Sequence, residues 1–272
     1  MIWFGSLQLR INPLLAVLAL AALTLAPSNC SGTSTGGGTP PPGSSPSPGG
    51  SHPLNAASRV LGAATCPKVK DLEGVFTKSS QMDNYLACLI PDVEQWIDAV
   101  HPNTPHPEGY YFIPQGVTGN DGACKYDDAT LAYCPGSEKV YFGEVAVWTQ
   151  YTKHGDASAA LIMAHEVTHH FQRLAKMPPA TVPHEQIRYE NQADCGGGTF
   201  IQFATRKGWL NVKDDIVDVA GTLLAAGSAP GPKRDHGSAP ERLAAFGLGA
   251  VGAPPNPLRS CNRYVPEVPL VQ

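Results

Sequence analysis

The sequence predicts an α+β fold in which a helix over residues 156–175 lies beside a small, mostly antiparallel sheet. Two observations support this prediction. Short segments rich in aromatic and β-branched residues lie between residues 110 and 142, and apolar residues recur at helical spacing through much of the later chain. Strands followed by helices, with no internal repeat, are typical of the α+β class.

The first elements are a helix and three strands. A helix is expected over residues 85–100, where apolar residues recur at helical spacing and Pro91 either kinks the helix or begins its second half. Residues 110–113 read as a strand that ends before Pro and Gly. Residues 130–134 and 139–142 flank a Pro-Gly turn, which predicts a β-hairpin.

The later elements are helices. Asp156 is expected to be the N-cap of the helix over 156–175, and Pro-Pro follows the end of that helix. A loop over residues 176–186 then leads to the helix that carries Glu190. Two further helices are expected near residues 212–226 and 241–248.

The N-terminal segment has the features of an export signal. Arg10 precedes an apolar run of about 14 residues, which is shorter than the roughly 20 residues of a membrane span. We therefore expect a signal peptide over residues 1–29. Gly, Ser, Thr and Pro dominate the next stretch, so residues 30–55 are expected to be a tether without a core, and residues 56–272 the folded domain.

The composition excludes some classes of partner. Charged residues make up 15% of the chain and the formal net charge is −4. Nucleic-acid binding would require a basic stripe, which the sequence lacks, so no nucleic-acid partner is expected. With 42% apolar residues, the chain can bury one sizeable core.

The cysteine count indicates disulfides. Six of the seven cysteines lie in the folded domain, an even number, as expected in an oxidising compartment. We expect Cys124 to pair with Cys134, and Cys195 with Cys261. Spacing alone leaves all 15 pairings of six cysteines open.

The seventh cysteine, Cys30, follows the apolar run at the place where a bacterial lipoprotein carries its lipid. Lipidation would make a membrane the partner of Cys30, with residues 31–53 as the tether. The residues before it, Pro-Ser-Asn, differ from the usual Leu-Ala-Gly type of signal. The alternative is cleavage after Ala26 and release of a secreted protein.

A short motif, HExxH followed by ExxxD, predicts a metal site. His165 and His169 are four residues apart, so a helix presents both imidazoles on one face. Glu190 is the expected third ligand, and a catalytic zinc takes three protein ligands and keeps an open position. Asp194, one turn after Glu190, is expected to accept a hydrogen bond from a ligand imidazole. Glu166 stands beside the metal ligands, within reach of a water molecule.

These residue types suit hydrolysis of an amide. Zinc lowers the pKa of a bound water, and Glu166 can take the water's proton and pass it to the leaving amine. The expected substrate is a protein or peptide. His236 is a candidate donor to the tetrahedral oxyanion, and a loop histidine with a structural hydrogen bond is the alternative. Cys195 is rotated about 140° from the ligand face, which favours a disulfide over a ligand.

Three ordered segments resemble the neutral zinc metallopeptidase family of bacteria; they are residues 164–172, 190–195 and 236–242. The hairpin before the motif helix is also similar to that family. The resemblance implies a zincin-like fold of the glutamate-ligand type. It also implies that His165, His169 and Glu190 bind zinc and that Glu166 is the catalytic base.

Three positions depart from the family pattern. Thr168 stands where the family usually has Gly, Glu241 where Gln is common, and Gly143 where the strand usually ends in Asp. None of the three departures removes a ligand or the base. Each is expected to bear on the shape of the substrate groove.

Three functions are compatible with the motif. The first is an exported, membrane-tethered zinc endopeptidase. The second is a catalytically silent surface lipoprotein that keeps the zincin fold as a binding module. The third is a structural zinc protein. The intact Glu166 favours the enzyme, because a silent scaffold need not keep a base there. The presence of three rather than four evident ligands argues against structural zinc.

Overall fold

The computed structural model describes residues 57–229, 231 and 234–272. The chain divides into two units, Met1–Ser51 and His52–Gln272, and every described residue belongs to the second. The expected signal peptide, the tether and Cys30 therefore lie outside the described residues.

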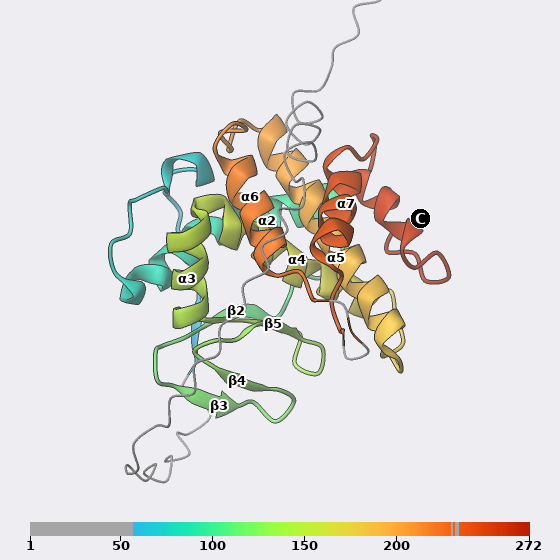
Figure 1. Cartoon of the computed structure of the whole chain (residues 1–272). Coiled ribbons are helices and arrows are strands. Elements are labelled where there is room, and N and C mark those ends of the chain that lie inside the picture. The colour runs from blue at the N-terminus through green and yellow to red at the C-terminus, as the bar shows by residue number, and fades with distance from the viewer. Residues whose placement is uncertain (1–56, 230, 232–233) are drawn as a thin grey trace, which may run out of the picture. The chain divides into compact units, whose positions relative to one another are not determined.

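In the described chain, five consecutive strands, β2 to β6, follow helix α2 and are themselves followed by five consecutive α-helices, α3 to α7 (Figure 1). The strands are β1 Ser58–Val60, β2 Gly109–Ile113, β3 Thr118–Asn120, β4 Lys125–Asp127, β5 Leu131–Cys134 and β6 Lys139–Gly143. The α-helices are α2 Met82–Val100, α3 Glu144–His154, α4 Asp156–Leu174, α5 Pro183–Arg206, α6 Asp215–Ala225 and α7 Ala239–Ala250. Three short 3-10 helices are η1 Val69–Asp71, η2 Ser79–Gln81 and η3 Pro257–Arg263. The α+β prediction is confirmed.

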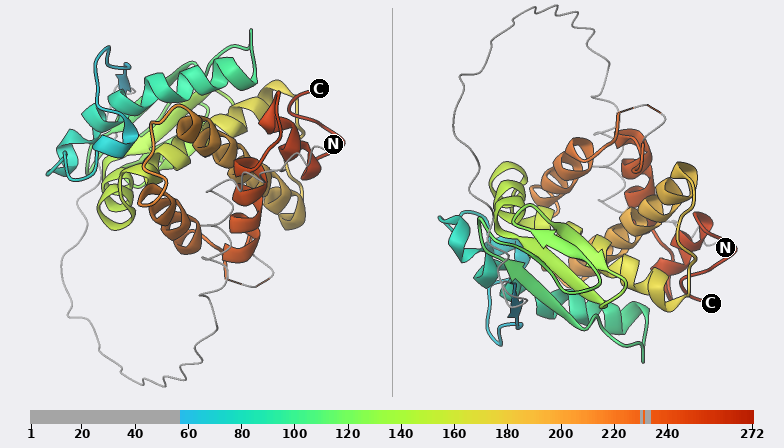
Figure 2. Two further views of the ribbon diagram at one scale, coloured as in Figure 1. Left: turned by 90° about the horizontal axis from the view of Figure 1, so that it is seen from above. Right: turned by 90° about the horizontal axis from the view of Figure 1, so that it is seen from below.

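The main sheet has four strands in the order β1-β2-β6-β5. β1 pairs antiparallel with β2, and β5 pairs antiparallel with β6, so the predicted hairpin is present. β2 and β6 run parallel, with Tyr111 opposite Tyr141, which makes the sheet mixed. β5 lies at one edge. The helices gather on one side of this sheet, and the view from below in Figure 2 shows its other face.

The face of the sheet away from the helices is covered by the β3–β4 hairpin. Tyr126 of β4 stacks on Tyr141 of β6 with ring centroids 4.8 Å apart. The Cys124–Cys134 disulfide joins the end of the hairpin to β5. Ile113 and Cys134 complete this small buried cluster. The β3–β4 hairpin therefore fixes β5 from the face of the sheet that lies away from the helices.

Helix α2 continues through Pro91 without a break. A proline inside a helix removes one N–H donor and leaves a carbonyl four residues earlier without its partner. Here that carbonyl belongs to Ala87, and it accepts a hydrogen bond from the backbone N–H of Ala63 at 2.9 Å. The segment before α2 thus replaces the missing bond, which the sequence pattern could not reveal.

The start of α4 differs from the prediction in its cap. Gly155, with φ of 80°, is the N-cap residue, and Asp156 is the first residue of the helix. Side chains from distant segments accept the free N–H groups: Glu73 accepts from Asp156 at 3.1 Å, and Asp218 accepts from Ala157. The prediction of Asp156 as N-cap was wrong because the capping carboxylates come from elsewhere in the chain.

Asp156 itself is buried, and its carboxylate accepts a hydrogen bond from the backbone N–H of Leu72 at 3.2 Å. Burial, and then the nearby carboxylates of Asp215, Glu73 and Asp218, raise the pKa of Asp156 from 3.8 to about 7. The folded state thus favours the protonated form. This group's contribution to stability is full below about pH 4 and is lost as the pH rises through about 7.

Asp156→Asn is therefore expected to raise the melting temperature at about pH 8 by about 2–4 °C or more. The asparagine stays neutral and can still accept the bond from Leu72. The advantage over wild type should shrink as the pH falls from about 8 to about 5. Thermal unfolding across this range measures it, and a difference that does not depend on pH would contradict the assignment.

Three consecutive glycines in α5 allow the helices around the site to pack closely. A Cβ atom on Gly196 would lie 1.9 Å from Oγ1 of Thr168 in α4, and one on Gly198 would lie 2.1 Å from the carbonyl oxygen of Phe246 in α7. Helices α4 and α7 can approach α5 at these points because glycine has no side chain. The glycines thus serve helix packing.

Within the described residues there are three disulfides: Cys66–Cys88, Cys124–Cys134 and Cys195–Cys261. Both expected pairings are confirmed. Disulfides form and persist in oxidising compartments, which indicates a place outside the cytoplasm. Among the described helices, none is both long enough and apolar enough to cross a membrane.

Element boundaries agree with the sequence pattern to within a few residues, and some elements were not predicted. Helix α3 and the short strands β1, β3 and β4 carry little periodic signal. The loop expected over residues 176–186 is shorter than predicted, because α5 begins at Pro183. Proline at the first turn of a helix is favourable, since the first N–H groups have no helical partner.

Candidate metal centre

Helices α4 and α5 bring the three expected ligands together. His165 Nε2 lies 3.2 Å from Nε2 of His169 and 3.2 Å from Oε2 of Glu190. His169 Nε2 lies 3.7 Å from the same carboxylate oxygen. One ligand atom from each residue lies within 4.8 Å of the other two, which makes this a group that could hold a metal ion.

The spacing of these atoms fits a tetrahedral metal. Ligand atoms bound to zinc at about 2.0–2.1 Å with tetrahedral angles lie about 3.3–3.4 Å from each other. The observed separations of 3.2, 3.2 and 3.7 Å are close to that value. Two imidazoles and one carboxylate are also the donor set of many catalytic zinc sites. The residues present therefore fit zinc.

Hydrogen bonds on the far side of each imidazole leave Nε2 free for a metal. His165 Nδ1 lies 2.9 Å from Oδ1 of Asp194, as expected from the sequence. His169 Nδ1 lies 2.8 Å from Oε1 of Gln172. An oxygen acceptor at Nδ1 places the proton there, so the lone pair is at Nε2 in both rings.

Arg242 of α7 completes the support of His165, and the sequence reasoning assigned it no role. Its guanidinium donates from Nε to Oδ2 of Asp194 at 2.9 Å and from Nη2 to Oδ1 at 2.8 Å. It also donates to the carbonyl of Ala226 at 3.0 Å. Such a two-pronged ion pair fixes both the position and the charge of the buried Asp194 carboxylate.

Glu190 is oriented by its own helix. Gln186, one turn earlier in α5, donates to Oε1 of Glu190 at 2.7 Å. The other carboxylate oxygen, Oε2, faces both imidazoles. Glu190 thus presents one oxygen to the metal position while the second is held by an amide.

The centre attracts positive charge. Burial would lower the pKa of His165, but the hydrogen bonds to Asp194 and Glu190 outweigh it and raise that pKa to about 10. Burial would raise the pKa of Glu190, but the neighbouring His169 and His165 hold it far below its usual range. Two buried imidazoles and a buried carboxylate that face one another are stabilised by positive charge between them. That charge can come from protons or from a metal ion.

Glu166 is buried beside the ligands and is held by the sheet. The backbone N–H of Tyr133 in β5 donates to Oε2 of Glu166 at 2.7 Å. Burial raises the pKa of this carboxyl group, and the nearby His165 and His169 partly oppose that rise. One carboxylate oxygen is thus fixed by β5. The other remains available to a water molecule.

The centre opens into a cleft of about 610 Å³. His165, Glu166, His169 and Glu190 line it on one side, and residues of β5 line it on another. The segment after α4, from Met177 to Ala180, also borders the cleft. A smaller, mainly apolar cavity of about 180 Å³ reaches from His165 and Glu166 towards α6 and α7. The site is therefore accessible from outside and extends inward.

His236 also reaches the centre. Its Nε2 lies 3.4 Å from Oε2 of Glu190, and its Nδ1 lies 3.0 Å from Oδ1 of Asp235. The side chain is 41% exposed and lines both cavities. The next residue, Gly237, packs closely on α5, since a Cβ atom there would lie 2.4 Å from Oδ1 of Asn191. The geometry thus places His236 beside the expected ligands.

His170, adjacent to His169 in sequence, is buried away from the centre. Its Nδ1 lies 3.0 Å from the hydroxyl of Tyr133, and its Nε2 lies 2.8 Å from the carbonyl of Pro105. Both ring nitrogens therefore have structural partners. Cys195 is in a disulfide, as expected from its position off the ligand face.

The three departures from the family pattern have structural explanations away from the cleft. Thr168 packs against Gly196 and donates to the carbonyl of Ala164 at 2.8 Å. Glu241 accepts hydrogen bonds from Ser238 and so caps α7. Gly143 caps α3, and a Cβ atom there would collide with the backbone of Asp128. The expectation that they shape the substrate groove has no support, since none of the three lines the cleft.

No protein-family model matches the sequence, and no curated protein or solved structure matches it either. The arrangement of side chains in the metal centre and cleft is therefore the main basis for a functional conclusion.

Proposed function

We propose that this protein is a zinc-dependent peptidase of zincin-like fold that hydrolyses peptide bonds outside the cytoplasm. One observation carries the proposal. Nε2 of His165, Nε2 of His169 and Oε2 of Glu190 converge at tetrahedral spacing, with the buried Glu166 carboxylate beside them at the base of an open cleft.

The residues divide the chemistry among them. Zinc, when bound, would lower the pKa of a water molecule and polarise the substrate carbonyl. Glu166 takes the proton of the attacking water and later gives it to the leaving amine. Tyr133 keeps that carboxylate in place through its backbone N–H. Asp194 and Gln172 hold the two imidazoles in the tautomer that leaves Nε2 free.

The edge strand β5 is suited to bind an extended peptide. Tyr133 directs its N–H towards Glu166, which means that its peptide groups point away from β6. Residues two apart in a strand point the same way, so the backbone groups of Leu131 also face the cleft. A peptide added along this edge would gain main-chain hydrogen bonds and lie across the metal position.

His236 is the proposed donor to the oxyanion of the tetrahedral intermediate. It lines the cleft next to Glu190 and is held on its other side by Asp235. A donor aimed at charge that develops during the reaction stabilises the transition state more than the substrate.

The first test is digestion of a peptide library by the full-length exported protein. We expect internal cleavage that is abolished by a zinc chelator and restored by about one equivalent of zinc. A sample re-supplied with magnesium is the control, since hard oxygen-preferring ions do not suit this donor set. Tight zinc binding without cleavage of any peptide would instead favour a silent binding module.

Membrane attachment through Cys30 is a separate proposal, based on the odd cysteine before a Gly/Ser/Pro-rich stretch. We expect the native protein to enter the detergent phase and Cys30→Ala to remain in the aqueous phase. Several acyl chains at one cysteine give stable attachment, whereas a single chain gives only marginal binding. If both forms remain aqueous, the protein is secreted and residues 31–53 have no tethering role.

A further inference from the structure

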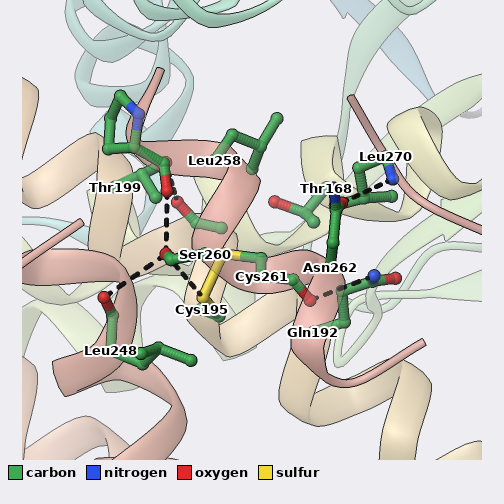
Figure 3. The surroundings of a disulfide bond; sticks show 12 residues. Thr168, Gln192, Cys195, Thr199, Leu248, Leu258, Ser260, Cys261, Asn262 and Leu270 are labelled. Carbon is green, nitrogen blue, oxygen red and sulfur yellow. Dashed lines mark hydrogen bonds between the residues drawn. A yellow bond between two sulfur atoms is a disulfide. The ribbon is translucent and has the colours of Figure 1, made fainter. Parts of the chain in front are cut away.

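Two buried glutamines connect His169 to the Cys195–Cys261 disulfide. Gln172 of α4 accepts from His169 Nδ1 at 2.8 Å and donates from Nε2 to Oε1 of Gln192 at 3.0 Å. Gln192 of α5 donates from Nε2 to the carbonyl of Cys261 at 3.3 Å (Figure 3). The chain of bonds therefore runs from a metal ligand to the backbone of η3.

Backbone carbonyls fix the direction of every bond in this chain. Gln172 Nε2 also lies 2.9 Å from the carbonyl of Tyr189, and a carbonyl oxygen can only accept. The nitrogen of each amide must therefore face a carbonyl: that of Gln172 faces Tyr189, and that of Gln192 faces Cys261. The oxygen of Gln172 is left facing His169, so His169 must carry its proton on Nδ1.

The backbone acceptor at the end of the chain is held by covalent and packing contacts. The disulfide bonds Cys261 to Cys195 of α5, and Cys261 is buried. Cys195 directly follows Asp194, the carboxylate that orients His165. The Cys195–Cys261 disulfide thus adjoins the residues that orient both imidazoles: Gln192 on the His169 side and Asp194 on the His165 side.

We propose that Gln172 and Gln192 are positioning residues that fix the tautomer and ring orientation of His169, with the disulfide-bonded Cys261 carbonyl as their anchor. This inference rests on the proposed zinc site. The two imidazoles are then held by different chemistry: His165 by the charged Asp194–Arg242 pair, and His169 by neutral amides. Outer partners of this kind set metal affinity and orientation without contacting the ion.

A matched control lies in the same helix. Gln202 of α5 is buried and donates from Nε2 to the carbonyls of Ala250 and Gly252 at 2.8 and 3.0 Å. Its hydrogen bonds resemble those of Gln192, but neither acceptor belongs to the metal centre. Replacing it should cost similar stability and leave the ligands undisturbed.

The experiment compares Gln172→Met, Gln192→Met, the double variant and Gln202→Met in the full chain. Methionine has a similar length and volume but cannot make these hydrogen bonds. Zinc affinity is measured by competition with a chelator of known affinity. Proton-detected nitrogen-15 NMR of the histidine rings identifies which nitrogen of His169 carries the proton. Melting temperatures show how much stability each variant has lost.

We expect Gln172→Met to bind zinc about 10–100-fold more weakly than wild type. Gln192→Met should show a smaller loss, together with a mixed tautomer signal for His169 in the zinc-free protein at a pH where the ring is neutral. The double variant should lose less than the product of the single losses, because both act through one ring. Gln202→Met should bind zinc as tightly as wild type, although its melting temperature should fall about as much as that of Gln192→Met.

The proposal is overturned if wild type binds one zinc and both Gln172→Met and Gln192→Met bind it as tightly as Gln202→Met does. Failure of wild type to bind zinc would instead reject the proposed function. A methionine variant too unstable to purify is replaced by the leucine variant at the same position, for which the same affinity comparison applies.

Discussion

Glu166→Gln is expected to retain one bound zinc and to hydrolyse peptides at least about 100-fold more slowly than wild type, since general-base catalysis contributes roughly 10²–10⁴-fold. The reason lies in the two ends of this side chain. One carboxylate oxygen accepts the Tyr133 N–H at 2.7 Å, and a glutamine oxygen can accept the same bond. The amide nitrogen on the other side cannot take a proton from water.

The comparison needs activity and metal content on the same samples. Glu94→Gln is a suitable control, because Glu94 lies in α2 with its side chain 39% exposed and 3.7 Å from Nδ1 of His106. It should keep both zinc and activity. If Glu166→Gln cleaves a confirmed substrate at nearly the wild-type rate with zinc bound, another group must accept the proton and the proposed mechanism is wrong.

Features of the site that depend on local spacing were predictable from the sequence. His165 and His169 share a face because they are four residues apart in one helix, and Asp194 follows Glu190 by one turn. The helix periodicity, the β5–β6 hairpin and the Cys124–Cys134 disulfide, whose cysteines are 10 residues apart, were predicted in the same way. The structure then places Asp194 at 2.9 Å from His165, as the spacing indicated.

Features that depend on contacts between distant segments were not predictable. The cap of α4 comes from Glu73 and Asp218, which lie far from Asp156 in sequence. Arg242 meets Asp194 only because α7 packs on the glycines of α5. A glutamine such as Gln172 gives no signal in one sequence, since its role depends on which way its amide faces. Arg242 lies within residues 236–242, one of the three segments that resemble the family. Its role could not be predicted, because the sequence does not show that it donates to the buried carboxylate of Asp194.

His169→Ala and Glu190→Ala are each expected to lose stoichiometric zinc, and with it all peptide hydrolysis. Each removes one of three ligand atoms that converge within 4.8 Å, and two remaining ligands cannot fill a tetrahedral site. His169 and Glu190 also face each other in the buried centre, so each loses its partner when the other is replaced. Glu190→Ala removes the carboxylate that two imidazoles face, at 3.2 and 3.7 Å. Metal content after dialysis, measured by atomic emission, gives the result directly.

Two histidine controls separate ligation from general damage. His170→Ala changes the residue next to His169, but His170 bonds to Tyr133 and Pro105 and does not face the metal position. It should lose stability and keep zinc. His184→Ala, at an exposed position in the first turn of α5, should change neither. If His169→Ala and Glu190→Ala both keep one full equivalent of zinc, the ion binds elsewhere. The converging lone pairs of the centre would then have to be stabilised by protons alone, and the peptidase proposal would fail with them.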